Sequence, residues 1–463
     1  MSFISLEFVL LFLLCFTLYH FISDKGRKLV LLAASGVFIG YFNPAFLVTA
    51  LVVSLFTYGA AILIEQAREK GRGFRLIYWG GISCLVLCWI GFRYANRLTG
   101  DSGFIFPLGM SFYTFQAIGY LTEVYWEEEK AERRPIDFLL YMLLFMKFLS
   151  GPIERSADLL PQVRKLSPAS YSMMTYGLKL IVVGLVKKLV LADHIAPYID
   201  GVFSSMHTAS GVQLLMACLL YPIELYADFS GYTDMAIGIG MLFGLKLSSN
   251  FAHPFAAQTT AEFWRRWHIS LSSWVRDYLL PLSSFTRRWG QWGVAASLMV
   301  TFIALGVWHG AGWTFAVYGF IQGLVIVWEL RTERIRNKVR KHIGRRLFAT
   351  LSVIRTYLIF AVSLVFFKAQ SVSDAFYFLR NISFQTHASW KEINIGMSDH
   401  ICIVAGAALL LMLLYDYLMS KRNQHRRLER QPILLRWTIY YLIVFALFAY
   451  GKFGTENFIY LQF

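Results

Sequence analysis

The sequence predicts an all-α protein that crosses a membrane many times. Hydrophobic residues make up 57% of its 463 residues, the mean hydropathy is +0.52, and uncharged apolar runs recur along nearly the whole chain. Backbone polar groups inside a bilayer must be hydrogen-bonded within the chain, so such runs are expected to be helices. We expect about 10–12 crossings together with re-entrant or interfacial helices, because several runs are shorter than the roughly 20 residues of a full crossing.

The apolar runs follow one another without a linker or an internal repeat, so we interpret residues 1–463 as a single integral-membrane domain. The first run is interpreted as a retained span and not as a signal peptide. Residues 1–7 carry no basic group and one acid, Glu7, and no small-residue cleavage site follows the run. The runs lie near residues 6–22, 29–42, 45–64, 77–95, 104–122, 136–149, 174–192, 212–228, 232–247, 294–310, 313–330, 348–367, 399–419 and 434–451.

The formal net charge of +16 is concentrated in a few loops. The positive-inside rule assigns these loops to the cytoplasm, so the N-terminus, the tail 452–463 and the polar segment 368–400 are expected outside. Because the basic groups stand at the ends of apolar runs, topology explains the charge and no nucleic-acid partner is expected. The basic loops lie at residues 25–28, 68–75, 331–346 and 421–430.

One imidazole lies deep inside an apolar run. Residues 294–328 contain no Lys, Arg, Asp or Glu, and His309 lies among them between Gly306 and Gly310. An ionisable side chain is costly in lipid, so it usually faces a cavity or a partner and has a function. We favour a functional His309. The alternative is a packed histidine that is hydrogen-bonded to a neighbouring helix.

Residues 263–280 are the most patterned polar stretch and predict an amphipathic helix at the membrane interface. His268 falls on the apolar arc near its edge, which directs it towards the protein interior. Arg265 and Arg266 lie on the polar arc. They would bind the phosphates of a CoA-type donor or anchor the helix to lipid headgroups, and the pattern does not separate these two interpretations.

Three carboxylates follow one another in residues 221–235 with apolar sequence on both sides. Glu224 and Asp228 are four residues apart and share a helix face, whereas Gly231 is expected to break the helix before Asp234. Buried carboxylates need partners, which the nearby arginine-rich stretch described above could supply, so a structural salt bridge is the favoured interpretation for at least one of them. A proton relay or the orientation of a histidine is the alternative for Asp228 or Asp234.

Residues 150–155 end an apolar run abruptly with Gly151 and Pro152. Such an ending at membrane depth predicts a re-entrant loop that lines a cavity. The five cysteines lie in apolar runs without zinc-like spacing, so no metal site is expected.

Together, these blocks and their order resemble the membrane-bound O-acyltransferase family, in particular its bacterial branch with the alginate O-acetylase and the D-alanyl transfer protein of teichoic acids. The most family-like core is 105–330, and similar hydropathy continues outside it. The matching blocks are residues 107–116, 150–155, 226–235, Asn250 with Phe251 and Pro254, 263–278 and 307–310.

The resemblance implies a ring of tilted helices around a thinned centre, with a funnel on each face. It makes His309 the essential histidine of the family and His268 a supporting one, with Asn250 as a further candidate. The chain departs from the family pattern at Ser283 and Ser284, where relatives often have two glycines. It also has Gln322 where many relatives have a histidine, and a glutamine cannot titrate.

Acyl transfer from a thioester to a hydroxyl needs a base and a means to offset charge on the intermediate. We expect His309 to be the base and His268, with a nearby acid, to position substrate or stabilise charge. The donor is expected to be acetyl-CoA or another acyl thioester from the cytoplasm, with its phosphates near Arg265 and Arg266. No Gly-x-Ser-x-Gly motif indicates a serine acyl-enzyme, while an acyl-histidine intermediate stays open.

The resemblance implies membrane lipid and a periplasmic protein that passes the acetyl group to a polysaccharide as partners, no bound cofactor, and a place in the bacterial inner membrane. Alginate-like exopolysaccharide is favoured; peptidoglycan, cellulose and D-alanine transfer to teichoic acid are the alternatives. A secondary transporter and a scaffold subunit of a polysaccharide export complex are the rival classes. A transporter should show repeat symmetry, and a scaffold should tolerate loss of His309.

Overall fold

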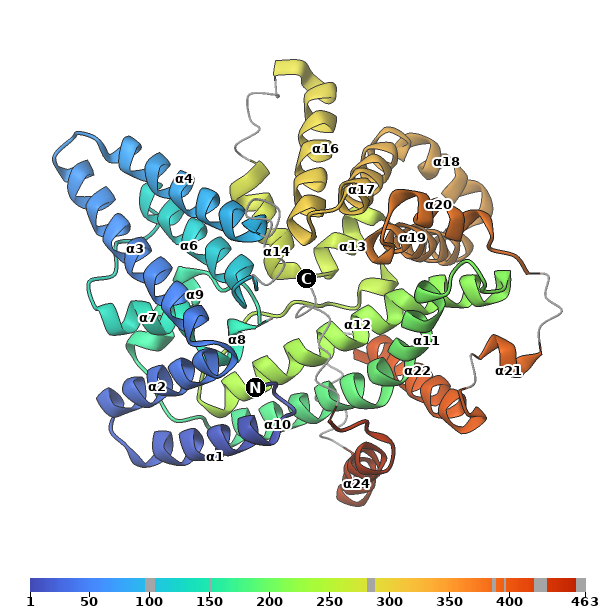
Figure 1. The fold of residues 1–463 in the computed structure, drawn as a ribbon, viewed down its shortest axis with the longest axis horizontal. Coiled ribbons are helices and arrows are strands. Elements are labelled where there is room, and N and C mark those ends of the chain that lie inside the picture. Colours follow the sequence, from blue (N-terminus) through green and yellow to red (C-terminus); the bar gives the residue numbers. More distant parts are fainter. Residues whose placement is uncertain are drawn as a thin grey trace. The chain divides into compact units, whose positions relative to one another are not determined.

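The computed structural model describes residues 1–95, 105–149, 151–280, 288–384, 389–394, 397–419 and 431–454. Within these residues every regular element is a helix, and an isolated antiparallel bridge joins Phe251 to Trp267. Figure 1 shows the order of the helices along the chain. Ser283, Ser284 and the basic loop 421–430, which the sequence analysis singled out, lie outside the described residues.

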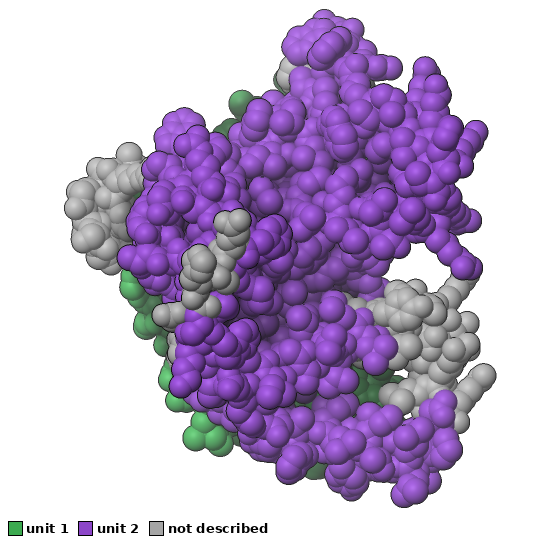
Figure 2. All heavy atoms as spheres, turned by 90° about the vertical axis from the view of Figure 1, so that its right-hand side faces the viewer, with its two compact units in different colours: residues 1–183, 232–249 green, residues 184–231, 250–463 purple. Residues whose placement is uncertain are grey.

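The chain forms two compact units, and each is built from two stretches of sequence. Unit 1 comprises residues 1–183 and 232–249, and unit 2 comprises residues 184–231 and 250–463 (Figure 2). Two helices, α10 (Tyr171–Leu185) and α12 (Gly211–Leu242), have residues in both units. The units are described separately below.

Unit 1 begins with long apolar helices and continues with short ones. The pairs α1 with α2, α2 with α3 and α3 with α4 and α6 are in contact. The helices that lie wholly in this unit are α1 (Leu6–Phe21), α2 (Asp24–Phe42), α3 (Pro44–Glu69), α4 (Phe74–Arg93), α6 (Met110–Tyr125), α7 (Pro135–Leu143), α8 (Phe145–Phe148) and α9 (Ser156–Arg164).

Unit 2 holds the residues around the two histidines. Its closest helix pair is the hairpin of α16 and α17. Its elements are the π-helix η1 (Val186–Ala192), α11 (Asp193–Ser204), η2 (Pro254–Ala256), α13 (Thr260–Arg266), α14 (Ile269–Trp274), η3 (Val275–Leu279), α16 (Gly290–His309), α17 (Trp313–Arg331), α18 (Glu333–Ile343), α19 (Arg345–Lys368), α20 (Val372–Arg380), α21 (Trp390–Ile393), α22 (Asp399–Met419) and α24 (Ile433–Tyr450).

Among the described residues, seven helices are long and apolar enough to cross a membrane, and α1 and the 399–414 part of α22 are shorter apolar helices. The seven are α3, α4, α12, α16, α17, α19 and α24. The predicted class, an all-α polytopic membrane protein, is confirmed.

Two sequence predictions about helix ends are wrong. Residues 212–228 and 232–247 are not separate segments, because α12 runs unbroken through Gly231. Gly231 instead permits close packing: a Cβ there would lie 2.7 Å from the carbonyl oxygen of Gly184. Residues 136–149 form no single span, since the chain breaks at Leu144 between α7 and α8.

Candidate active site

His309 is the last residue of α16. Gly310 takes an extended conformation directly after it and ends the helix. The imidazole is surrounded by aromatic rings, with centroids of Trp308, Phe367 and Tyr318 at 4.7, 5.3 and 6.4 Å, and the residue is only 9% exposed. Such an apolar wall limits access of water to the imidazole and strengthens electrostatic interactions in the site.

Close backbone packing between α16 and α17 fixes the helix that carries His309. A Cβ at Gly306 would lie 2.2 Å from the carbonyl oxygen of Phe315, and one at Gly319 would lie 2.2 Å from that of Phe302. No side chain fits at either position, so these glycines let the helices approach more closely than larger residues would. The glycines around His309 therefore shape its surroundings.

His268 does not lie on a continuous amphipathic helix, contrary to the sequence prediction. It stands between α13 and α14 with φ 45° and ψ 57°, a left-handed conformation that is uncommon for a residue with a side chain. Hydrogen bonds to a distant segment coincide with the break: Ala252 N–H donates to the Arg266 carbonyl at 2.9 Å, and Ile269 N–H donates to the Asn250 carbonyl at 2.9 Å. Strain of this kind persists only when surrounding contacts determine it, and it clusters at functional sites.

The His268 ring is 1% exposed and packs edge-on against the ring of Phe229, with centroids 4.8 Å apart. Burial, and secondly the charge of His309, hold the pKa of His268 well below its ordinary value. His268 is therefore neutral at pH 7, with one ring nitrogen able to accept a hydrogen bond.

Asn250 is fully buried beside this junction. Its Oδ1 accepts a hydrogen bond from the backbone N–H of Ser270 at 3.2 Å, which fixes the orientation of the amide. Its Nδ2 has no hydrogen-bond partner in the described part of the chain. A buried amide N–H without an acceptor is costly unless a ligand supplies one, so Asn250 can donate to a substrate oxygen.

Asp228 forms a buried ion pair with Lys188 of the π-helix η1, with Nζ and Oδ1 2.6 Å apart. The same Lys188 amine lies 2.8 Å from Asp193 Oδ1. The ion pair is a structural salt bridge of the kind that the sequence analysis favoured, but it is formed with a lysine of η1, whereas the arginine-rich stretch was expected to supply the partner. The relay role stays a prediction. Asp234 is half-buried on the part of α12 that belongs to unit 1.

The two arginines of α13 differ in their contacts with the rest of the protein. Arg266 pairs with Glu262 on the same helix at 2.6 Å, and its Nη1 donates to the His253 carbonyl at 3.3 Å. Arg265 is exposed. Arg265 is thus the more available of the two for a phosphate, and its role in donor or headgroup binding stays a prediction.

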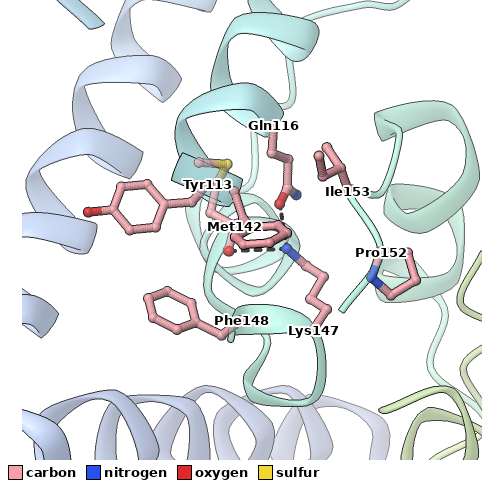
Figure 3. Close-up of a pocket in the computed structure, with 8 residues that line it drawn as sticks. Tyr113, Gln116, Met142, Lys147, Phe148, Pro152 and Ile153 are labelled. Atoms are coloured by element: carbon pink, nitrogen blue, oxygen red, sulfur yellow. Dashed lines mark hydrogen bonds between the residues drawn. The ribbon is translucent and has the colours of Figure 1, made fainter. Parts of the chain in front are cut away.

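Sequence reasoning missed a buried amine in unit 1. Lys147 is 4% exposed and donates to Gln116 Oε1 at 2.5 Å and to the Met142 carbonyl at 3.2 Å (Figure 3). A small pocket adjoins it, lined also by Phe112, Tyr113, Phe148, Pro152 and Ile153. The signal was present: Lys147 is the one charged residue in the apolar run 138–149.

The pocket agrees with the cavity expected at the Gly-Pro ending. Burial lowers the pKa of Lys147 to about 7 and raises the pKa of Glu154 to about 7, and each group favours the charged form of the other. The Glu154 carboxylate accepts hydrogen bonds from Ser248 N–H at 2.6 Å and from its hydroxyl at 2.9 Å. These hydrogen bonds connect the segment 151–155 to the segment after α12.

Residues 133–371 match the model of the membrane-bound O-acyltransferase family, which spans more than half of the chain. The probable alginate O-acetylase of Azotobacter vinelandii is 35% identical over 380 residues, which are 78% of this chain and 75% of that protein. The chain belongs to the membrane-bound O-acyltransferase family.

Other relatives show how varied this part of the O-acyltransferase family is. The peptidoglycan O-acetyltransferase of Helicobacter pylori is 28% identical over 90% of this chain and 89% of its own length. The teichoic acid D-alanyltransferase of Streptococcus thermophilus is 30% identical over 53% of this chain and 63% of its own length. The matched family region, 133–371, contains His268, His309 and Asn250. The chain is therefore a multi-pass membrane O-acyltransferase.

Proposed function

We propose that this O-acyltransferase moves an acetyl group from a cytoplasmic thioester, acetyl-CoA, towards an extracytoplasmic polysaccharide. The observation that carries the proposal is the presence of two buried histidines in unit 2: His309 ends α16 inside an aromatic wall, and His268 is 1% exposed and packs against Phe229. Acetyltransfer is favoured over D-alanyl transfer because the acetyltransferase relatives match more of the chain.

His309 is the general base of the proposed reaction. It takes the proton of the acceptor hydroxyl as the oxygen attacks the thioester carbonyl. The new C–O bond forms, the C–S bond breaks, and the proton passes from His309 to the leaving thiolate. The atoms and charges of this step balance without another co-reactant.

Residues at the His268 junction complete the proposed site. The Asn250 Nδ2–H donates to the carbonyl oxygen as negative charge develops on it, which is the largest kind of stabilisation in acyl transfer. Neutral His268 accepts a hydrogen bond from the substrate or positions it. Arg265, and to a lesser degree Arg266, bind donor phosphates on the cytoplasmic side.

The acceptor side requires a partner. We propose a periplasmic protein that receives the acetyl group and places it on the polymer, with the protein in the bacterial inner membrane and both termini outside. Alginate-like exopolysaccharide is the favoured polymer, in line with the names of the alginate O-acetylase relatives. Peptidoglycan is the second candidate, supported by the long match to a peptidoglycan O-acetyltransferase.

The test is polysaccharide and peptidoglycan O-acetylation in cells whose single copy carries His309→Ala, with the membrane level of the protein measured alongside. We expect acetyl ester to disappear from one polymer at an unchanged protein level. Normal acetylation of every polymer would overturn the enzyme assignment of His309 and favour a scaffold role.

A further inference from the structure

Gln322 lies in the middle of α17 and is 1% exposed. A buried carboxamide must satisfy both an acceptor and a donor. Its Oε1 accepts the indole Nε1–H of Trp264 in α13 at 3.0 Å, and its Nε2 donates to the hydroxyl of Ser363 in α19 at 2.7 Å. One side chain therefore joins three helices of unit 2.

The direction of these hydrogen bonds is fixed. An indole nitrogen can only donate, so the amide oxygen must face Trp264. The Ser363 hydroxyl gives its own proton to the Phe360 carbonyl at 2.7 Å and therefore accepts from Gln322. A leucine at 322 would break both bonds, and a glutamate would lose the donor to Ser363.

Trp264 connects Gln322 with both histidine-bearing segments. It lies four residues before His268 on α13, and its ring packs edge-on against Phe302 of α16, with centroids 5.4 Å apart. Phe302 lies on the same helix as His309. A shift of the indole would therefore change the packing at the His268 junction and at α16.

A second contact from α17 fixes the beginning of the same short helix. The Glu329 carboxylate accepts the backbone N–H of Thr260 at 2.9 Å and pairs with Arg355 at 2.6 Å. With its start held by Glu329 and its indole held by Gln322, α13 has little freedom to move relative to α17.

We propose that Gln322 is a positioning residue that acts through Trp264 to hold the His268 junction against α16, the helix that carries His309. Its effect on turnover rests on the function proposed above, whereas its effect on the two imidazoles does not. A misplacement of about 1 Å in an active site can lower the rate about 100-fold, so loss of this contact should lower kcat by about 10- to 100-fold with little change in the KM for the donor.

The experiment compares Gln322→Leu, Trp264→Phe and the double variant in purified full-length protein. Trp264→Phe keeps an aromatic ring and removes the N–H donor together with part of the indole volume, and it carries the test if Gln322→Leu does not fold. Gln291→Leu, at an exposed position of α16, is the matched control. Peptide mass spectrometry follows the pH-dependent rate at which diethyl pyrocarbonate modifies His268 and His309, and turnover of acetyl-CoA is measured on the same samples.

We expect at least about tenfold faster modification of His268 in either single variant, the same rate in the double variant, and no change in the control. Unchanged modification rates in folded variants, or effects of the two substitutions that multiply, would overturn the proposal. If the wild-type protein shows no acyl transfer, the proposed function fails while the modification rates still decide the role of Gln322.

Discussion

The Glu329 carboxylate of α17 accepts a hydrogen bond from the backbone N–H of Thr260, with the two atoms 2.9 Å apart, where α13 begins. Arg355 of α19 holds the other carboxylate oxygen at 2.6 Å. The first N–H groups of a helix have no partner within the helix, so a buried helix start needs such an acceptor. A side chain 69 residues away in sequence therefore organises the segment that ends at His268.

Replacement of Glu329 by alanine should destabilise the protein by about 1–3 kcal/mol, because Thr260 N–H loses its acceptor and Arg355 loses a partner. Thermal unfolding in detergent measures the effect. Glu333→Ala, at an exposed position at the start of α18, is the control and should leave the midpoint unchanged. Equal midpoints for both variants would show that the α13 start is not held in this way.

The buried cluster of Lys188, Asp193 and Asp228 predicts which of two substitutions destabilises the protein more. Lys188→Met should destabilise by about 3–5 kcal/mol, because it leaves two buried carboxylates without the amine that lies 2.6 and 2.8 Å from them. Asp228→Asn keeps a polar partner for the amine and should destabilise less. The level of folded protein in membranes and the unfolding midpoint give the order, and a milder effect for Lys188→Met would contradict it.

His268 predicts how stability depends on pH. Its pKa is lowered in the folded protein, so the unfolded chain binds more protons as the pH falls below the ordinary value of 6.5. The stability due to neutral His268 is therefore present above pH 6.5 and is lost on acidification. The unfolding midpoint of the wild-type protein should fall more between pH 7.5 and pH 5.5, chosen about one unit either side of that value, than the midpoint of His268→Gln. An equal fall of the unfolding midpoint in both proteins would refute this role of His268.

The hairpin glycines predict a contrast between two alanine substitutions in membrane helices. Gly306→Ala places a methyl group 2.2 Å from the Phe315 carbonyl oxygen, whereas Gly59→Ala on α3 meets nothing within 4 Å. Gly306→Ala should lower stability by about 1–3 kcal/mol and reduce activity by moving His309, while Gly59→Ala should do neither. Unfolding and activity measured on both variants test this, and equal behaviour would argue against tight packing at Gly306.

The apolar runs were sufficient to predict the fold class and the long apolar helices other than α12, because a long apolar run in a membrane protein has few alternatives to a helix. The prediction failed at α12, where the sequence shows a glycine among carboxylates. Gly231 is a weak helix former, yet α12 continues through it, and the absence of a side chain lets Gly184 approach closely. Nothing local in the sequence indicates this contact.

The candidate site was predicted in part. His309 and His268 stood out because ionisable groups are rare in apolar patterns. The break at His268 depends on pairing with residues 250–252, and the role of Gln322 depends on Trp264 and Ser363, which all lie in other segments of the chain. Helical periodicity describes one segment at a time, so it could not predict contacts between segments.

The most direct test of the account is donor turnover by the purified protein in lipid vesicles, with thiol release from acetyl-CoA measured in the presence of an acceptor. His309→Ala is compared with His342→Ala, whose imidazole is exposed on α18. General-base catalysis contributes about 100- to 10,000-fold, so His309→Ala should lose at least about 100-fold in rate while His342→Ala stays at the wild-type rate. Turnover by folded His309→Ala at the wild-type rate would contradict the assignment of His309 as the base.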